Sequence, residues 1–176
     1  MPKKEYLKNG FTLIEIIVTI TIIAVVTAIA ANGFNRSNSG ASVISQVEIT
    51  TSDLRGIGFS ALNSEQFQLQ STSSWGLYLE GDENRYTIFA DIDGDGSYDS
   101  NEKFKTVDFN PNLFICLDWN SQCQTTGTVI FTNVTAVPYI DGAIIDATDL
   151  GVLITDNVSS VSKEIFINHF GTVSHN

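Results

Sequence analysis

Basic residues are scarce in this chain of 176 residues, which has 9 lysines and arginines against 20 aspartates and glutamates. Three of the nine, Lys3, Lys4 and Lys8, fall within the first ten residues, and the rest of the chain has 6 basic and 19 acidic residues. A protein that binds nucleic acid nonspecifically needs lysine and arginine to neutralise phosphates. The composition therefore argues against nucleic acid as a partner.

Catalytic patterns are also lacking. The two histidines, His169 and His175, have no cysteine or further histidine at metal-ligand spacing. No serine–histidine–aspartate arrangement, phosphate-binding loop or pair of active-site carboxylates is identifiable. We therefore predict that the protein is not an enzyme. Two matches to the glycosylation sequon, at 133–135 and 157–159, are of a kind that is common by chance.

Only two cysteines are present, Cys116 and Cys123, in the stretch LFICLDWNSQC. Strand-like flanks around a short polar loop would let them face each other. A disulfide between them requires an oxidising compartment, and the alternative is a pair of unrelated reduced thiols. We predict the disulfide, because the features of the N-terminal segment indicate export.

One long apolar run dominates the N-terminal part of the chain. Residues 11–31 contain a single charge, Glu15, and as a helix of about 1.5 Å per residue they would span roughly 31 Å, the thickness of a hydrocarbon core. The preceding lysines favour a cytoplasmic N-terminus. A secretory signal peptide is the alternative, but its apolar region normally has about 7–15 residues. A carboxylate within a membrane is by default functional and has a partner.

The stretch KNGFTLIEIIVTITIIAVV, residues 8–26, resembles the class III signal of type IV pilins and type II secretion pseudopilins. The resemblance implies that a prepilin peptidase cuts between Gly10 and Phe11, and that the new Phe11 amine is then N-methylated. It also implies that Glu15 pairs with the N-terminal amine of a neighbouring subunit during assembly, which would offset the cost of its burial. Glu15 argues against the tip subunit, which typically lacks this glutamate.

The same resemblance predicts three parts: a cytoplasmic leader at 1–10 that is removed, an N-terminal helix at 11–62 with a transmembrane part at 11–31, and an exported β-rich domain at 63–176. The protein would be single-pass in the bacterial inner membrane, with its C-terminal domain periplasmic or extracellular, before it joins a filament. Its partners would be other pilin or pseudopilin subunits and the prepilin peptidase and methylase. Major pilins often have proline where this chain has Asn32-Gly33, a pair that could loosen the helix locally.

Beyond the apolar run, residues 41–62 have the spacing of an amphipathic helix, with Val43, Ile44, Val47, Leu54, Ile57 and Ala61 on its apolar stripe. Short β-like runs follow, separated by polar turns, at 66–70, 75–80, 85–91, 103–109, 113–119, 128–134, 143–147, 152–157 and 164–173. One helix followed by strands predicts an α+β fold, with a long N-terminal helix packed on a C-terminal antiparallel sheet.

This order and the terminal IFINHFGTVS are similar to H-type minor pseudopilins and to T- and U-type minor pilins. The resemblance implies a minor structural subunit of a type II secretion pseudopilus or a type IV pilus. The alternative is a pilus-associated binding module, for DNA uptake, adhesion or recognition of a secretion substrate.

The acidic stretch DIDGDGSYDSNE, residues 91–102, fits the twelve-residue calcium loop of EF-hands, although the flanks are strand-like. Gly96 would allow the sharp turn, and Ser97 would offer its backbone carbonyl. A solvated turn is the alternative, but so many carboxylates repel one another without a cation. We predict Ca²⁺ as a possible cofactor, with the ligands Asp91, Asp93, Asp95, Ser97, Asp99 and Glu102.

Overall fold

The computed structural model describes residues 11–72, 74–119, 122–132, 136–140, 143–144, 149–158, 160–168 and 170–175. The predicted leader with Gly10, His169 and the sequon at 133–135 lie outside the described residues. The chain divides into two units, Met1–Asn38 and Ser39–Asn176.

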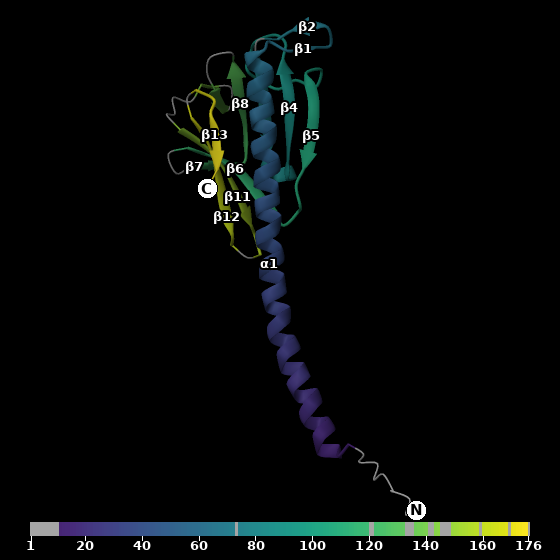
Figure 1. Cartoon of the computed structure of the whole chain (residues 1–176). Helices are drawn as coiled ribbons and strands as arrows, with labels where there is room; N and C mark the ends of the chain where they lie inside the picture. The colour runs from purple at the N-terminus through teal and green to yellow at the C-terminus, as the bar shows by residue number, and fades with distance from the viewer. Residues whose placement is uncertain are drawn as a thin grey trace, which may run out of the picture. The chain divides into compact units, whose positions relative to one another are not determined.

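One helix, α1 (Leu13–Leu62), begins in the first unit and ends in the second (Figure 1). Its segment Leu13–Ala30 is long and apolar enough to cross a membrane, with a mean hydropathy of 2.7. The threonines within this segment do not leave polar groups unpaired, because Thr19, Thr21 and Thr27 each donate a hydroxyl hydrogen bond of 2.7–2.9 Å to a carbonyl one turn earlier. The backbone remains helical through Asn32 and Gly33, the pair that could have loosened the helix locally.

The later part of α1 belongs to the second unit and packs on its sheets. The amphipathic stripe is confirmed for five positions, since the buried side chains of α1 include Val43, Val47, Leu54, Ile57 and Ala61. Ile44 was wrongly assigned to this stripe: its side chain is 49% exposed. At about 100° per residue Ile44 lies at the margin of the apolar face.

Two antiparallel sheets and a small hairpin make up the rest of the described second unit. The hairpin consists of β1 (Gln66–Phe67) and β2 (Gln70–Ser71). The larger sheet has the order β10-β9-β8-β3-β4-β5 and contains β3 (Ser74–Glu80), β4 (Arg85–Asp91), β5 (Lys103–Asp108), β8 (Thr126–Thr132), β9 (Ala136–Ile140) and β10 (Ala143–Ile144). The other has the order β13-β12-β11-β6-β7 and contains β6 (Leu113–Trp119), β7 (Gln122–Gln124), β11 (Asp149–Asp156), β12 (Ser162–Asn168) and β13 (Val173–His175).

One hydrophobic core joins α1 to both sheets. Alternate residues of β3 and β6 point into it, among them Leu77, Leu79, Ile115 and Leu117, and β11 and β12 contribute Val152, Ile154, Ile165 and Ile167. In Figure 1 the second half of α1 runs between β13 and the β4–β5 pair. The α+β prediction with antiparallel sheets is therefore confirmed.

Several strand predictions were wrong in detail. Residues 66–70 form a hairpin instead of one strand, and 164–173 is divided between β12 and β13. Residues 81–84, by contrast, have the sequence of a hairpin turn and do join β3 to β4 as a hairpin, through a short 3₁₀ helix, η1 (Gly81–Glu83). The sequence patterns gave no sign of β7 or β9, because both are short and lack a clear alternation of apolar residues.

Candidate functional site

The start of α1 is held by reciprocal hydrogen bonds between Thr12 and Glu15. The Glu15 amide donates to the Thr12 hydroxyl at 3.3 Å, and the Thr12 amide donates to Oε2 of Glu15 at 3.3 Å. This is a capping box, in which threonine and glutamate each satisfy a backbone donor that the first helical turn leaves unpaired. Phe11 precedes the cap, outside the helix, and is 83% exposed.

The capping box gives Glu15 a partner within its own chain. The Thr12 hydroxyl also lies 3.4 Å from the Glu15 carboxylate, so the acid is flanked by two donors before any neighbouring subunit is considered. Sequence reasoning missed Thr12, although the pattern Thr-x-x-Glu before an apolar run is itself the signal of a capping box. The arrangement begins the helix after Phe11.

The acidic loop joins β4 to β5 and is tightened by its own carboxylates. Asp91 accepts from the Gly94 amide at 2.8 Å, Asp93 from the Asp95 amide at 3.2 Å, and Asp95 from the Ser97 amide at 2.7 Å. Gly94 and Gly96 both have φ of 77°, a left-handed conformation that favours glycine. The turn-forming role predicted for Gly96 therefore agrees with its backbone.

Three of the predicted metal ligands converge. Carboxylate oxygens of Asp91, Asp93 and Asp95 lie within 4.8 Å of one another, close enough to share one cation. Asp99 and Glu102 are not part of this group. The Glu102 carboxylate instead accepts hydrogen bonds from the Ile92 amide at 2.8 Å and the Asp99 amide at 3.2 Å, which closes the loop on itself.

Two of the loop's carboxylates are buried without a cationic partner among these contacts. Asp91 is 4% exposed and Glu102 is 1% exposed. Burial raises the pKa of Asp91, and the negative charges of Asp93 and Asp95 raise it further. Burial also raises the pKa of Glu102, again with a contribution from Asp91. The loop thus holds negative charge in a place where charge is costly.

Tyr98 holds the loop against the outer face of the larger sheet. Its ring stacks on Tyr78 of β3, with ring centres 5.2 Å apart, and packs at an angle on Phe89 of β4 at 5.5 Å. Aromatic contacts at these distances are typically worth about 0.5–1.5 kcal/mol beyond burial.

The predicted disulfide is present. Cys116 of β6 and Cys123 of β7 are bonded, with Cα atoms 5.4 Å apart. Cys116 is fully buried and β7 lies at the edge of its sheet, so the bond attaches the edge strand to the core. A bonded pair is typical of proteins that fold in an oxidising compartment.

Two polar contacts attach α1 to the sheets at neighbouring positions. Asp53 accepts a hydrogen bond of 2.6 Å from the Tyr86 hydroxyl on β4. Its carboxylate also forms an ion pair of 2.9 Å with Lys105 on β5. On the other side the Arg55 guanidinium donates to the Val173 carbonyl of β13 at 3.0 Å. The sequence patterns did not identify Asp53 or Arg55, because their partners lie 33 to 118 residues away.

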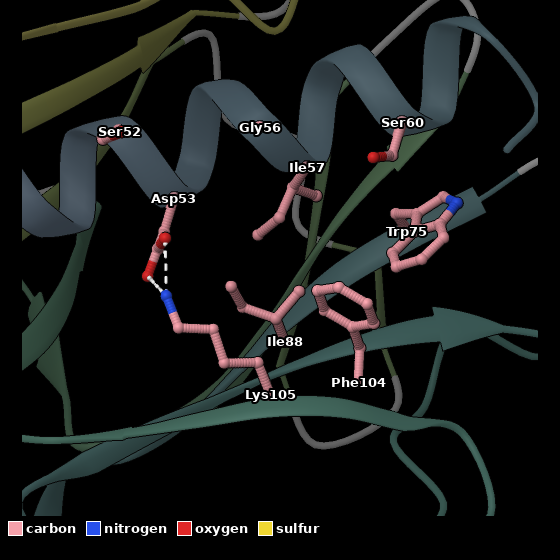
Figure 2. A pocket seen from close by; sticks show the side chains of 9 residues that line it. All are labelled: Ser52, Asp53, Gly56, Ile57, Ser60, Trp75, Ile88, Phe104 and Lys105. Carbon is pink, nitrogen blue, oxygen red and sulfur yellow. Dashed lines mark hydrogen bonds and ion pairs between the residues drawn. The ribbon is translucent and has the colours of Figure 1, made fainter.

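A groove of about 200 Å³ lies between α1 and β5, with the Asp53–Lys105 pair on its lining (Figure 2). The pairing of β4 with β5 shifts by one residue at Phe104, which forms a β-bulge. Because of this bulge, the consecutive residues Phe104 and Lys105 both line the groove. Figure 2 shows the Phe104 ring beside Trp75, and their ring centres are 5.5 Å apart. Phe104 nevertheless remains 59% exposed.

One comparison with known proteins agrees with the N-terminal pattern. The family model of the prokaryotic N-terminal methylation motif matches residues 7–31. A solved structure, the minor pseudopilin EpsH from the type 2 secretion system of Vibrio cholerae, is similar with a TM-score of 0.48 and 10% identity, over 77% of this chain and 96% of that chain. A comparison with curated proteins finds no match.

Proposed function

By its N-terminal methylation motif this chain is a member of the type IV pilin and pseudopilin family, and we propose that it serves as a minor structural subunit of a type II secretion pseudopilus or a type IV pilus. The observation that carries the proposal is the motif at residues 7–31, which coincides with the membrane-length segment Leu13–Ala30 of α1. The family is structural, which supports a role in assembly rather than catalysis.

In this proposal prepilin peptidase cuts between Gly10 and Phe11 on the cytoplasmic side. The lysines of the leader support a cytoplasmic N-terminus, and the disulfide supports export of the second unit to an oxidising compartment. The Thr12–Glu15 capping box suits this reaction, because it begins α1 beyond Phe11, the residue that follows the scissile bond. Glu15 would then exchange its local partners for the Phe11 amine of a neighbour.

The test is co-expression of the full chain with and without a prepilin peptidase, followed by intact-mass measurement. We expect loss of residues 1–10 and addition of one methyl group only when the peptidase is present. Gly10→Ile should block cleavage, while the matched control Asn9→Ala should be cut normally. An N-terminus elsewhere, or a mass unaffected by the peptidase, would contradict the proposal.

We further propose that the acidic loop binds Ca²⁺, with Asp91, Asp93 and Asp95 as its first ligands and Ser97, Asp99 and Glu102 as the other candidates. The convergence of three carboxylates within 4.8 Å supports this, as does the burial of Asp91 and Glu102 as acids with raised pKa. Hard oxygen ligands suit this ion, and weak sites fill at extracellular concentrations of about 10⁻⁴–10⁻³ M or above.

Calorimetric titration of the unit 39–176 with CaCl₂ tests the loop directly. We expect saturable binding of one ion per chain that disappears in Asp91→Asn, with Asp108→Asn as the control outside the loop. If no saturable heat is observed up to 10 mM CaCl₂, the calcium proposal is contradicted, whereas the proposed role in assembly is not affected. A calcium-stabilised loop would also suit the alternative of a pilus-associated binding module for adhesion or recognition of a secretion substrate.

A further inference from the structure

Two acidic side chains lie close together on the sheet that contains β6, β11 and β12. Gly151 of β11 lies opposite Asp118 of β6. Two residues further along β11, Leu153 lies opposite Glu164 of β12. Opposite residues of antiparallel strands share a face of the sheet, and the alternate positions, such as Val152, point into the core. Asp118, Gly151 and Glu164 are therefore together on the face that is turned away from the core.

Gly151 leaves room for the Glu164 carboxylate to reach across β11. A β-carbon at position 151 would collide with Oε1 of Glu164. Glycine within a strand weakens it and often marks a place where another group approaches the backbone closely. Here that group is the carboxylate, which lies over Gly151 and so comes one strand nearer to Asp118 of β6.

The Asp118 carboxylate has an unmet need for a hydrogen-bond donor. Its Oδ1 is shielded from solvent and has no hydrogen-bond partner among the residues that the structure describes. Buried polar atoms are nearly always paired, so this atom requires an explanation. An ionised carboxylate can only accept hydrogen bonds, whereas a protonated carboxyl group donates one. Glu164 becomes a donor for this oxygen when it takes up a proton.

The surroundings favour the protonated form of Glu164. Burial raises its pKa, and the negative charge of Asp118 raises this pKa further. A carboxyl group that loses hydration and faces a second carboxylate holds its proton more firmly. A recess of about 250 Å³, lined by Leu153, Ser162, Lys163 and Glu164, lets solvent reach the glutamate, so the proton can exchange.

Other titratable groups near the pair are few among the side chains that the structure describes. His175 of β13 lies opposite Ile165, a core position, and lines a different recess beside α1. Lys163 lines that recess and also the one at Glu164. The cysteines at 116 and 123 are bonded to each other and do not titrate. Because a cation beside Glu164 would lower its pKa, Lys163 needs a variant of its own.

We propose that Asp118 and Glu164 form a proton-binding site, in which one proton is shared between the two carboxyl groups above Gly151. The folded chain then holds a proton that the unfolded chain releases above the ordinary pKa of glutamate, 4.5. The site stabilises the sheet fully below about pH 4.5, and this contribution is lost as the pH rises through the raised pKa of the folded state. The inference goes beyond the proposed assembly role and does not depend on it.

The experiment follows the side-chain carboxyl carbon of Glu164 by ¹³C NMR in the full chain in detergent micelles, from about pH 4 to 8 and with EDTA. Glu164→Gln assigns the signal. We expect a midpoint above 4.5, and Asp118→Asn should lower it because the second negative charge is gone. Lys163→Gln should not lower the midpoint. A midpoint of 4.5, or one that Asp118→Asn leaves in place, would overturn the proposal.

Gly151→Ala tests the geometry of the site. The added β-carbon displaces the Glu164 carboxyl group, which is the mobile end of its side chain, from the place above β11. The midpoint should therefore fall toward 4.5, with the β-sheet signal in circular dichroism retained. Gly56→Ala is the matched control, since a β-carbon there meets no atom within 4 Å, and it should leave the midpoint unchanged. An unchanged midpoint in a folded Gly151→Ala variant counts against the site, and if this variant does not fold, Asp118→Asn decides.

Glu164→Gln also supplies a donor that does not depend on pH, because its amide group can donate to Oδ1 of Asp118. Its melting temperature should be close to that of the wild type at pH 5 and several degrees higher at pH 7.5. The other buried acids with raised pKa, Asp91 and Glu102, are present in both proteins and cancel in the difference. A difference that does not grow with pH would show that the wild type loses no shared proton.

Discussion

Asp53 of α1 accepts a hydrogen bond of 2.6 Å from the Tyr86 hydroxyl of β4, and this bond joins the helix to the larger sheet. Tyr86 is fully buried, and the Asp53 carboxylate is also paired with Lys105. A hydrogen bond to a charged group contributes about 1.5–3 kcal/mol. We therefore expect Tyr86→Phe to lower the free energy of unfolding of the unit 39–176 by about 2 kcal/mol, measured in urea. Lys105→Ala should cost less than about 1 kcal/mol, because the lysine is half exposed.

The same tyrosine predicts a loss of stability in alkali. Burial raises the pKa of Tyr86 far above its ordinary value of 10.0, and the hydrogen bond to Asp53 raises it further. The folded state keeps a proton that the unfolded state loses above pH 10, so this contribution to stability is present below about pH 10 and is lost as the pH rises. The unfolding free energy of Tyr86→Phe should therefore fall less steeply from pH 9.5 to 11 than that of the wild type. Between pH 7 and 8 the two curves should run parallel, and parallel curves above pH 10 would contradict the assignment.

The parts of the fold that the sequence predicted depend on residues close together in the chain. The apolar run, the amphipathic spacing of residues 41–62 and the acidic loop are local patterns with local causes. The Asp53–Tyr86 contact and the division of the strands between two sheets depend on pairings far apart in the chain. The bulge at Phe104 is likewise set by the register between β4 and β5, which cannot be predicted from the periodicity of the sequence.

Loss of the disulfide should destabilise the second unit moderately. Cys116 and Cys123 are seven residues apart, and closing so short a loop is worth about 2–3 kcal/mol in the chain-entropy account. The double variant Cys116→Ser with Cys123→Ser should lower the urea midpoint accordingly, without loss of the β-sheet signal in circular dichroism. Dithiothreitol should lower the wild-type midpoint by a similar amount and leave the double variant unchanged.

The capping box predicts different effects for two variants at Thr12. Thr12→Val removes the hydroxyl that accepts from the Glu15 amide, and loss of a cap costs about 1 kcal/mol. Amide exchange at Glu15, measured in micelles by NMR, should therefore be faster in Thr12→Val, while Thr12→Ser should retain protection. Equal exchange in all three proteins would show that the cap does not hold the helix start.

Glu15→Ala should separate processing from assembly. The glutamate is not at the scissile bond, so we expect the leader to be removed as in the wild type. Recruitment into filaments should fall, because no carboxylate is left for the N-terminal amine of a neighbour. The readout is the amount of the variant in sheared filaments relative to the membrane fraction, and Thr19→Val is the control for a lost polar group in the same helix. Normal recruitment of Glu15→Ala would contradict the pairing.

The acidic loop should respond differently to Asp93→Asn and Glu102→Gln. Asp93 is exposed and lies in the group of three carboxylates, so its charge should stabilise the loop only when calcium is present. Glu102 is buried and accepts two backbone amides, and Gln can accept only one of them while its NH₂ group faces the other donor. In EDTA, Glu102→Gln should therefore lower the melting temperature by several degrees. Asp93→Asn should not lower it, because the variant loses a charge that repels Asp91. With 5 mM calcium the wild type should gain stability and Asp93→Asn should gain much less. If Asp93→Asn gains as much as the wild type, the three aspartates do not share a cation.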